Sequence, residues 1–439
     1  MFRYFIKLGS LSIRKNPVLS ALMVAAIAIG IGACMTVVNV YYVMNGDPIP
    51  AKSSELFYVQ LDSWDPNEAV NDDGEPPDQV TYIDATALMA ANRARRQVVS
   101  YQVGRVIQPE GEGARPFQVS GRASTADFFT MFDVPFQYGS GWDESADRSA
   151  DQVVVLGRRT NDRVFGGEDS TGRRLVINGD SYRVVGVMDE WNPVPKFYDL
   201  TTGDFNDVEE VFMPFSVAID KELSGWGNTN CWKPLGEGGW QAFLNSECVW
   251  MQMWVELGNE AEWAEYKAFL DAYTESQKAL GRFQRPLNNS LLNVTEHLEA
   301  QEVVDDSVQI LLVLAVLFLL VCLLNTIGLL LAKVMRRSGD VSLRRALGAS
   351  RRAVFGQYIT EAGMIGLAGG IIGIGLTRLG LTGIHVLYAD LEWIDRVLGM
   401  DWVMVLTAVA LAILSALAAA LYPTWRAVRI HPASQLKSL

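Results

Sequence analysis

An arginine-rich segment at residues 333–353 contains the side chains best suited to contacting another molecule. Its leucines and alanine lie three and four positions apart, so one face of a helix is apolar and the arginines point elsewhere. Asp340 predicts an N-cap and Gly348 a helix end, with a short helix over 341–347 between them. The candidate contact residues are Asp340, Val341, Leu343, Arg344, Arg345, Ala346, Leu347 and Gly348. Basic flanks also anchor a segment near anionic lipid headgroups, so these residues alone are more typical of a positive-inside loop without a protein partner.

No pattern in the 439 residues points to catalysis or to metal binding. The sequence lacks the phosphate-binding loop G-x-x-x-x-G-K-[S/T], the zinc motif H-E-x-x-H and the nucleophile motif G-x-S-x-G. Its 3 histidines lie far apart in the sequence and form no metal-ligand pattern. We therefore expect a non-catalytic chain that binds no metal ion, cofactor or nucleic acid.

Four apolar runs position this segment and the rest of the chain. Each is long enough to cross a hydrocarbon layer about 30 Å thick as a helix. They predict spans at 18–44, 308–334, 355–380 and 402–422. Around the spans we expect an amphipathic lead-in helix at 1–17, a large domain at 46–306, a loop at 335–353, a short loop at 381–401 and a tail at 423–439.

The basic residues are distributed unevenly, although the whole chain has a net charge of −13. The short segments 1–17, 333–353 and 423–439 are all basic, and short basic segments stay in the cytoplasm. The pattern predicts a multi-pass membrane protein, with both termini and the segment 333–353 in the cytoplasm and 46–306 and 381–401 outside. The lead-in helix and the basic flanks are expected to contact membrane lipids.

Small residues crowd the third apolar run. Gly366 and Gly370, and likewise Gly369 and Gly373, have the four-residue spacing that lets helices approach closely. We predict that these glycines lie at helix–helix contacts. Glu361, near the inner edge of this run, is costly in lipid unless it faces protein, so a structural role is favoured over a proton relay.

The residues between the first two runs predict an α+β domain. DQVVVL at 151–156 is typical of a buried strand, and Asn178-Gly179 indicates a tight hairpin turn. The tryptophan-rich stretch 226–263 matches no pattern that we can interpret. The polar residues 299–307 contain no helix breaker, so the second span is expected to extend outward as a helical stalk.

The chain has 4 cysteines. Cys34 and Cys322 lie within apolar runs and are expected to pack there. Cys231 and Cys248 lie in the large domain, where a position outside the cytoplasm favours a disulfide between them.

Several segments together resemble permeases of the MacB/FtsX/LolC superfamily of ABC transporters. DVSLRRALGA at 340–349 is similar to the family's E-I-G-L-R-R-A-L-G-A box, with Asp340, Val341 and Ser342 in place of Glu, Ile and Gly. The stretch that begins at Pro423 resembles the family's closing pattern P-x-x-R-A-x-R-I-x-P-A. In the large domain, VVVLGRRTNDRVFGG and TGRRLVINGDSYRVVGV resemble the family's V-A-V-L-G and F-x-V-V-G-V stretches.

The resemblance implies a fold class: an α-helical membrane protein with four transmembrane helices and a large extracytoplasmic α+β domain, a MacB-type periplasmic core, inserted between helices 1 and 2. It also implies that the residues around Leu343–Leu347 form a coupling helix seated on an ABC ATPase, which binds ATP and Mg²⁺. Because this chain begins at the lead-in helix, the ATPase is expected on a separate subunit. Such permeases also pair with a second permease, identical or a paralogue, and some work with a periplasmic adaptor and an outer-membrane channel.

Two functions fit this family. The first is a permease subunit that couples ATP hydrolysis to movement of the extracytoplasmic domain and drives export of a drug, peptide or lipid-like substrate by mechanotransmission. The second is an FtsX-like mechanical regulator of a periplasmic partner such as a cell-wall hydrolase, with no transported cargo. The size of the domain at 46–306 favours the exporter, and the sequence does not identify the substrate.

Overall fold

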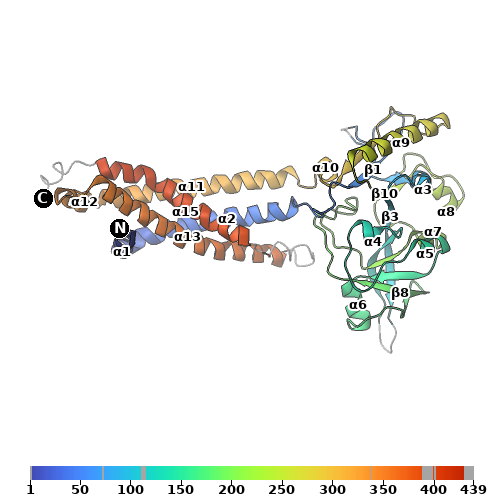
Figure 1. Cartoon of the computed structure of the whole chain (residues 1–439), viewed down its shortest axis with the longest axis horizontal. Helices are drawn as coiled ribbons and strands as arrows, with labels where there is room; N and C mark the ends of the chain where they lie inside the picture. The colour runs from blue at the N-terminus through green and yellow to red at the C-terminus, as the bar shows by residue number, and fades with distance from the viewer. Residues whose placement is uncertain are drawn as a thin grey trace. The chain divides into compact units, whose positions relative to one another are not determined.

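The computed structural model describes residues 2–71, 74–109, 115–336, 338–387, 399 and 402–429. The chain divides into two compact units, which Figure 1 shows coloured along the sequence. One consists of Met1–Asn45 and Val304–Leu439 and is called the helical unit. The other, Gly46–Val303, is called the inserted domain.

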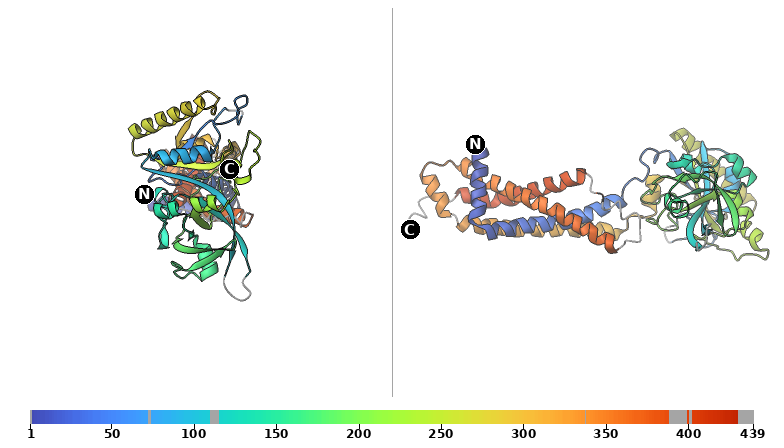
Figure 2. Two further views of the ribbon diagram at one scale, coloured as in Figure 1. Left: turned by 90° about the vertical axis from the view of Figure 1, so that its right-hand side faces the viewer. Right: turned by 90° about the horizontal axis from the view of Figure 1, so that it is seen from below.

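The helical unit contains 4 helices that are long and apolar enough to cross a membrane. They are α2 (Pro17–Met44), α11 (Asp306–Arg336), α13 (Arg351–Leu387) and α15 (Trp402–Arg429). Among the described residues, this unit also contains α1 (Phe2–Lys15) and α12 (Ser338–Ala346). Helix α1 forms where the lead-in helix was expected and lies across the ends of the long helices (Figure 2). The arrangement confirms four candidate spans with a large domain between the first and the second.

The last span differs from its expected bounds. Helix α15 continues through Pro423 to Arg429, where a tail was expected. Pro423 has no backbone N–H, so α15 lacks one backbone hydrogen bond at this position. The helix nevertheless continues, and the next residue, Thr424, is buried in the bundle. Residues 388–398, 400 and 401, which form most of the expected short loop, lie outside the described residues, as does the end of the tail at 430–439.

Helix α13 approaches two neighbours closely through its glycines. A Cβ atom at Gly366 would lie 2.6 Å from the Cβ of Ala416 on α15, and Gly370 faces the same helix. A Cβ atom at Gly369 would lie 2.8 Å from Cγ2 of Ile27 on α2, and Gly373 faces that helix too. The two pairs of glycines therefore lie at two different helix contacts.

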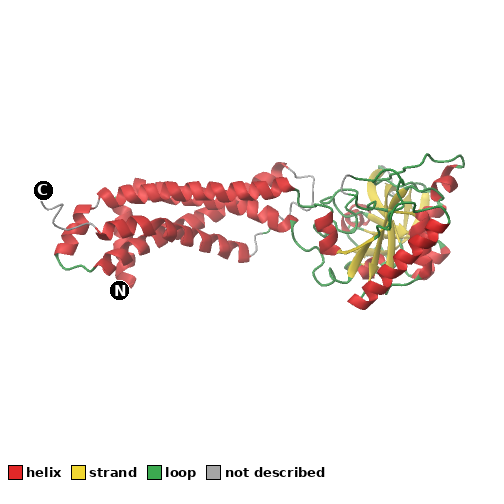
Figure 3. Ribbon diagram, turned by 90° about the horizontal axis from the view of Figure 1, so that it is seen from above, coloured by secondary structure: helices red, strands yellow, loops and turns green. Residues whose placement is uncertain are grey.

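The inserted domain is built on one mixed sheet, seen in Figure 3 with helices around it. The strand order is β11-β1-β10-β3-β4-β9-β6-β8-β5, with β2 paired to β10, and β7 paired to β3 and β8. The strands are β1 (Leu56–Gln60), β2 (Val80–Thr81), β3 (Arg96–Gln108), β4 (Phe117–Ser124), β5 (Phe136–Gly139), β6 (Val153–Leu156), β7 (Arg174–Ile177), β8 (Asp180–Met188), β9 (Val211–Pro214), β10 (Val249–Glu256) and β11 (Ser290–Asn293). The helices are α3 (Tyr82–Ala91), α4 (Phe128–Met131), α5 (Glu144–Ser149), α6 (Arg158–Phe165), α7 (Phe215–Asp220), α8 (Gly239–Leu244), α9 (Glu260–Ala279) and α10 (Val294–Ala300). This composition confirms the α+β class.

Apolar cores cover both faces of the sheet. Consecutive side chains of a strand point to opposite faces, and accordingly Val98 belongs to one core while Val99 belongs to the other. Aromatic rings fill much of the second core, where Phe128, Phe132 and Trp254 are almost fully buried. Burial on both faces makes the sheet a stiff platform for the loops at its edges.

The hairpin of β7 and β8 confirms the turn that Asn178-Gly179 predicts. Both residues have positive φ angles, 51° and 90°, as a type I′ turn requires. Asn178 Oδ1 accepts a hydrogen bond from the backbone N–H of Val106 at 2.6 Å, and the N–H of Asn178 donates to Val106 O at 2.9 Å. The turn is therefore fixed to the edge of β3.

The predicted continuous stalk is wrong. Helix α10 ends at Ala300 and α11 begins at Asp306, and the residues between them are not helical. Glu302 adopts a left-handed backbone with φ 47°, and the Gln301 side chain donates to Asp78 Oδ1 at 2.8 Å. These local interactions replace the next helical turn although no glycine or proline is present.

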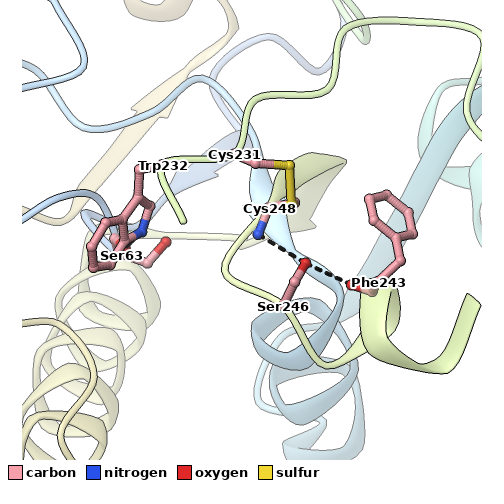
Figure 4. Close-up of a disulfide and its surroundings, with 6 residues drawn as sticks. All are labelled: Ser63, Cys231, Trp232, Phe243, Ser246 and Cys248. Atoms are coloured by element: carbon pink, nitrogen blue, oxygen red, sulfur yellow. Dashed lines mark hydrogen bonds between the residues drawn. A yellow bond between two sulfur atoms is a disulfide. The ribbon is translucent and has the colours of Figure 1, made fainter. Parts of the chain in front are cut away.

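A disulfide joins Cys231 to Cys248 in the tryptophan-rich stretch (Figure 4). Next to it, Trp232 Nε1 donates to the carbonyl of Ser63 at 3.0 Å, and the backbone N–H of Cys248 donates to Ser246 Oγ at 3.2 Å. The disulfide therefore ties an irregular loop to the start of β10.

Candidate functional site

One apolar face of α12, formed by two leucines and an alanine, is exposed on the outside of the helical unit. Leu343 is 56% exposed and Leu347, just beyond the helix, is 80% exposed. Ala346 between them is also exposed. A contiguous exposed apolar face is typical of a surface that another molecule covers. We call Leu343, Ala346 and Leu347 the α12 apolar face.

The opposite side of α12 is held by the bundle. Val341 is buried with Val334, Val354 and Tyr358 in a small apolar cluster. Arg345 Nη1 donates to the carbonyl of Val428 on α15 at 3.1 Å. Arg344 remains exposed and donates to Gln357 Oε1 on α13 at 2.9 Å. The segment is therefore fixed to three long helices while its leucines remain uncovered.

The ends of α12 differ in part from the prediction. The described helix begins at Ser338, so the backbone of Asp340 lies inside it and Asp340 is not its N-cap. At the other end, Gly348 has φ +98° and its N–H donates to the carbonyl of Arg345 at 3.1 Å. A glycine with positive φ ends the helix, as expected.

A buried ion pair joins the helices on either side of α12. Lys333 of α11 pairs with Glu361 of α13, and their side chains are only 1% and 2% exposed. Ser12 of α1 donates to Glu361 Oε1 at 2.7 Å, and Lys333 Nζ donates to Ser20 of α2 at 3.0 Å. We call these four residues the Lys333 cluster. It connects four helices, since each residue comes from a different one.

The sequence indicated only part of the Lys333 cluster. Glu361 was expected to have a structural role, and the ion pair is consistent with that role. Lys333 was counted with the basic segment 333–353 at the end of the second span, whereas it is buried in the last turn of α11 and paired with Glu361. Gly9 could have indicated that α1 packs against another helix. A Cβ atom at Gly9 would lie 3.1 Å from Met364 Sδ, so α1 approaches α13 closely beside Glu361.

The inserted domain contains a second buried charge network, which the sequence did not indicate. Arg122, Lys196, Asp199 and Glu209 are each 0% exposed. Arg122 pairs with Asp199 and lies 2.7 Å from Glu209 Oε1, and Lys196 Nζ lies 2.7 Å from the same oxygen. Burial raises the pKa of Glu209, but Arg122 and Lys196 outweigh it and lower the pKa to about 2. We call these four residues the Arg122 network.

Neither cluster has the composition of a metal centre. Within the described ranges, no group of three or more His, Cys, Asp or Glu side chains is placed to hold a metal ion. In the Arg122 network each carboxylate faces a cation, and hydroxyl groups complete the shell, such as Tyr198, which donates to Glu209 Oε2 at 2.9 Å. Such an arrangement stabilises a fold and has no free ligand for a cation.

Two family models match the chain, one after the other along the sequence. A model of MacB-like periplasmic core domains matches residues 20–272, which include most of α2 and most of the inserted domain. A model of the FtsX-like permease C-terminal region matches residues 312–432 and so covers most of α11 and all of α12, α13 and α15.

Curated relatives agree with the family models. The pyoverdine export ATP-binding/permease protein PvdT of Pseudomonas entomophila is 24% identical over 337 residues, which cover 76% of this chain and 45% of PvdT. The uncharacterised ABC transporter permease YvrN of Bacillus subtilis is 23% identical over 320 residues, which cover 71% of this chain and 68% of YvrN. The chain spans about half the length of the PvdT relatives that it matches.

Two solved extracytoplasmic domains align with part of the chain at low identity. The periplasmic region of MacB from Actinobacillus actinomycetemcomitans aligns with 58% of this chain at 14% identity and a TM-score of 0.38. The extracellular domain of the ABC-type transporter YknZ from Gram-positive bacteria aligns with 54% at 11% identity and a TM-score of 0.35. Because the MacB-like model alone matches more than half of the residues, the chain belongs to the family of ABC transporter permeases that combine a MacB-like periplasmic core domain with FtsX-like permease helices.

Proposed function

We propose that this chain is the permease subunit of an ABC transporter in which a separate subunit hydrolyses ATP and this chain transmits the resulting movement. In this proposal ATP and Mg²⁺ bind only to the ATPase subunit, and the permease is non-catalytic. Both termini and α12 lie in the cytoplasm, and the membrane is the bacterial inner membrane. The inserted domain lies outside and changes position as ATP is hydrolysed.

The α12 apolar face is the observation that carries this proposal. Leu343 and Leu347 are the most exposed apolar side chains of a segment whose other side is fixed by Val341 and Arg345. Exposed leucines on a fixed segment are costly unless another protein covers them. An ATPase surface that covers this face would hold α12 through leucine contacts and the adjacent arginines.

The connections of α12 give a route for the movement. The segment joins α11 to α13 directly, and the Lys333 cluster ties these helices to α1 and α2. Helices α2 and α11 in turn lead into the inserted domain at Asn45–Gly46 and Val303–Val304. A displacement of α12 would therefore reach both connections to the inserted domain at once.

Export is the use of this movement that we favour. The matched PvdT proteins are named for pyoverdine export, which places extrusion of a small molecule among the activities of relatives. In this scheme a second permease, identical or a paralogue, completes the transporter, and a periplasmic adaptor with an outer-membrane channel can extend it. Loss of export on removal of the ATPase subunit would support the scheme.

The docking of the ATPase can be tested by changing the α12 apolar face. We expect the double substitution Leu343→Asp and Leu347→Asp to reduce co-purification of the ATPase subunit at least 10-fold, because two carboxylates would be buried in the interface. Membrane insertion should be unaffected. The matched control is Leu280→Asp, which changes an equally exposed leucine in the inserted domain (76% exposed) and should leave the ATPase bound. Undiminished co-purification of the double variant would refute the docking site.

A further inference from the structure

Arg105 of β3 is a buried cation that forms no ion pair with any described residue. Its side chain is only 5% exposed, and only one of its three guanidinium nitrogens has an acceptor: Nη1 donates to Gly104 O at 2.6 Å. In the described part of the chain, Nε and Nη2 have no hydrogen-bond partner. Burial lowers the pKa of Arg105, while Tyr101 and Tyr182 oppose that shift. A buried guanidinium with two free donors is costly, and such a group requires an explanation.

Two other arginines of the inserted domain show which group Nε and Nη2 of a guanidinium bind in this protein. Arg95 holds Glu262 with Nε at 2.9 Å and Nη2 at 2.7 Å. Arg282 holds Glu247 with Nε at 2.8 Å and Nη2 at 3.0 Å. In both cases the two parallel N–H groups take the two oxygens of one carboxylate. The same two N–H groups are vacant on Arg105.

The guanidinium of Arg105 lies beside the part of β3 between its pairing with β10, which ends at Ser100, and its pairing with β7, which begins at Ile107. Three alternate carbonyls along this part of β3 show the position of the guanidinium. Gln102 O accepts a hydrogen bond from the N–H of Trp226 at 2.8 Å, and Val106 O accepts one from the N–H of Asn178. Gly104 O, which lies between them, accepts from Nη1 of Arg105. Between Trp226 and Asn178, the arginine thus takes the place that a neighbouring strand would occupy. The guanidinium therefore lies beside β3, and its Nε and Nη2 atoms are themselves buried.

A cavity of about 350 Å³ opens beside this part of β3. Its lining includes Arg105, Gln118, Asn178, Glu222 and Trp226. The indole of Trp226 is 51% exposed and lies over Gly104, where a Cβ atom would be 3.1 Å from the ring. Glu222 is exposed and does not hydrogen-bond to the guanidinium. The cavity thus combines a vacant pair of cationic donors with a flat aromatic surface, at a volume typical of small-molecule sites.

We propose that this cavity binds a small molecule in which a carboxylate is attached to a flat aromatic group. The carboxylate accepts hydrogen bonds from Nε and Nη2 of Arg105, and the aromatic group stacks on Trp226. The carboxylate supplies the missing counter-charge, and the donors are already in place and desolvated before the ligand arrives. The site goes beyond the proposed function, since it needs neither ATP nor an ATPase subunit.

The test is a calorimetric titration of the purified full chain in lipid nanodiscs, without nucleotide. Indole-3-acetate is the probe, and its neutral amide, indole-3-acetamide, is the matched control ligand. We expect the acetate to bind at least 10-fold more tightly than the amide. Arg105→Met should weaken acetate binding at least 10-fold, and Trp226→Ala should weaken it about 10-fold through lost stacking. Arg174→Met, a change at an exposed arginine, should leave the affinity unchanged.

Thermal unfolding separates a binding role from a structural one. Without ligand, Arg105→Met should unfold at the same or a higher temperature than the unchanged chain, because it removes an uncompensated buried charge. Indole-3-acetate should raise the unfolding temperature of the unchanged chain but not that of Arg105→Met. Equal affinity for the acetate and the amide, or unweakened binding by Arg105→Met, would overturn the proposal. Inorganic phosphate that binds as tightly as indole-3-acetate would overturn the aromatic part of it.

Discussion

The two units of this chain bury charge in different ways. In the inserted domain, the Arg122 network joins four ionised side chains on one sheet and its adjoining loop, and every one of them is 0% exposed. In the helical unit, the Lys333 cluster has a single ion pair, and Glu361 Oε2 has no hydrogen-bond partner among the described residues. Its four members come from four helices. The network therefore stabilises one fold, whereas the cluster stabilises the arrangement of separate helices next to α12.

This difference shows where movement is expected. In the Arg122 network both carboxylates have all their oxygens hydrogen-bonded, and among the described residues only Arg122 Nε has no partner. Partial opening would leave buried charges without partners, so the network favours one conformation of the loop 196–209. One pair with a spare carboxylate oxygen offers fewer interactions to break. The Lys333 cluster is thus the better place for a change of conformation that begins at α12. Four predictions test this contrast, beginning with the largest effect.

Removal of Arg122 should have the largest effect on stability. We expect Arg122→Met to destabilise the inserted domain by about 3–5 kcal/mol, because Asp199 and Glu209 would remain buried without that cation. Hydrogen exchange of β3 and β4 in the full chain measures the loss. The control is Arg159→Met, since Arg159 is 56% exposed and pairs with the neighbouring Glu210; it should cost less than about 1 kcal/mol. Similar losses in the two variants would contradict the role of the network.

Breaking the ion pair in the helical unit should have a smaller, repairable effect. Lys333→Met should cost about 2.5–3.5 kcal/mol, because Glu361 would remain as an uncompensated charge among the spans. Adding Glu361→Gln should restore most of the loss, since the amide keeps a hydrogen-bond acceptor for Ser12. Protease sensitivity of α1 is the readout. If the double variant were more sensitive than Lys333→Met, the pair would not be what holds α1.

The glycine contacts of α13 allow a matched comparison within one helix. A Cβ atom at Gly366 would lie 2.9 Å from the backbone oxygen of Ala412, whereas a Cβ atom at Gly375 meets nothing within 4 Å. We expect Gly366→Ala to destabilise the bundle by about 1–3 kcal/mol through overpacking. Gly375→Ala should be neutral or slightly stabilising. Denaturant unfolding of the purified chain in detergent micelles measures both, and equal effects would show that α13 and α15 are not in close contact at Gly366.

The smallest effect concerns a side chain that is kept neutral. Burial lowers the pKa of His297 to about 3, and its ring stacks on Tyr58 at 4.1 Å between centroids. Since this pKa is below the unfolded value of 6.5, the unfolded state binds the extra proton, and stability falls as the pH drops below 6.5. Between pH 7 and pH 6 the loss is roughly 0.7 kcal/mol.

His297→Phe isolates that contribution. The variant should show a shallower fall in the unfolding temperature from pH 7 to pH 5 than the unchanged chain. Glu209 provides no such change in this range, because its pKa of about 2 and its unfolded value of 4.5 both lie below pH 5. An identical pH dependence in the two chains would show that the pKa of His297 is the same in the folded and unfolded states.

Features of the structure could be predicted from the sequence where the signal lies within one helix, strand or turn. Four apolar runs, the Asn178-Gly179 turn and the glycine pairs each carry their signal in neighbouring residues. The same holds for the α12 apolar face, whose leucine spacing is local. The ends of the helices were predicted less accurately. Asp340 lies inside α12 and Pro423 lies inside α15, although both residues were expected at helix ends. Both helices also pack against their neighbours, and such contacts are not visible in the local sequence.

Interactions between distant residues could not be predicted in this way. Lys333 and Ser12 meet Glu361 only because the helices fold together, and a lysine at the end of a span is ordinarily read as a solvated charge. The Arg122 network and the vacant donors of Arg105 depend on loops that return to the sheet from far along the chain. A single sequence contains no local mark of such pairings.

Photo-crosslinking from position 347 tests the central claim most directly. A photoreactive amino acid placed at Leu347, which is 80% exposed, would be activated in cells that express the complete transporter. The control is the same substitution at Leu379, a 68% exposed residue of α13. We predict a crosslink from position 347 to the ATPase subunit and none from position 379. Crosslinks from position 347 to lipid alone, with the ATPase present in the same cells, would contradict the account.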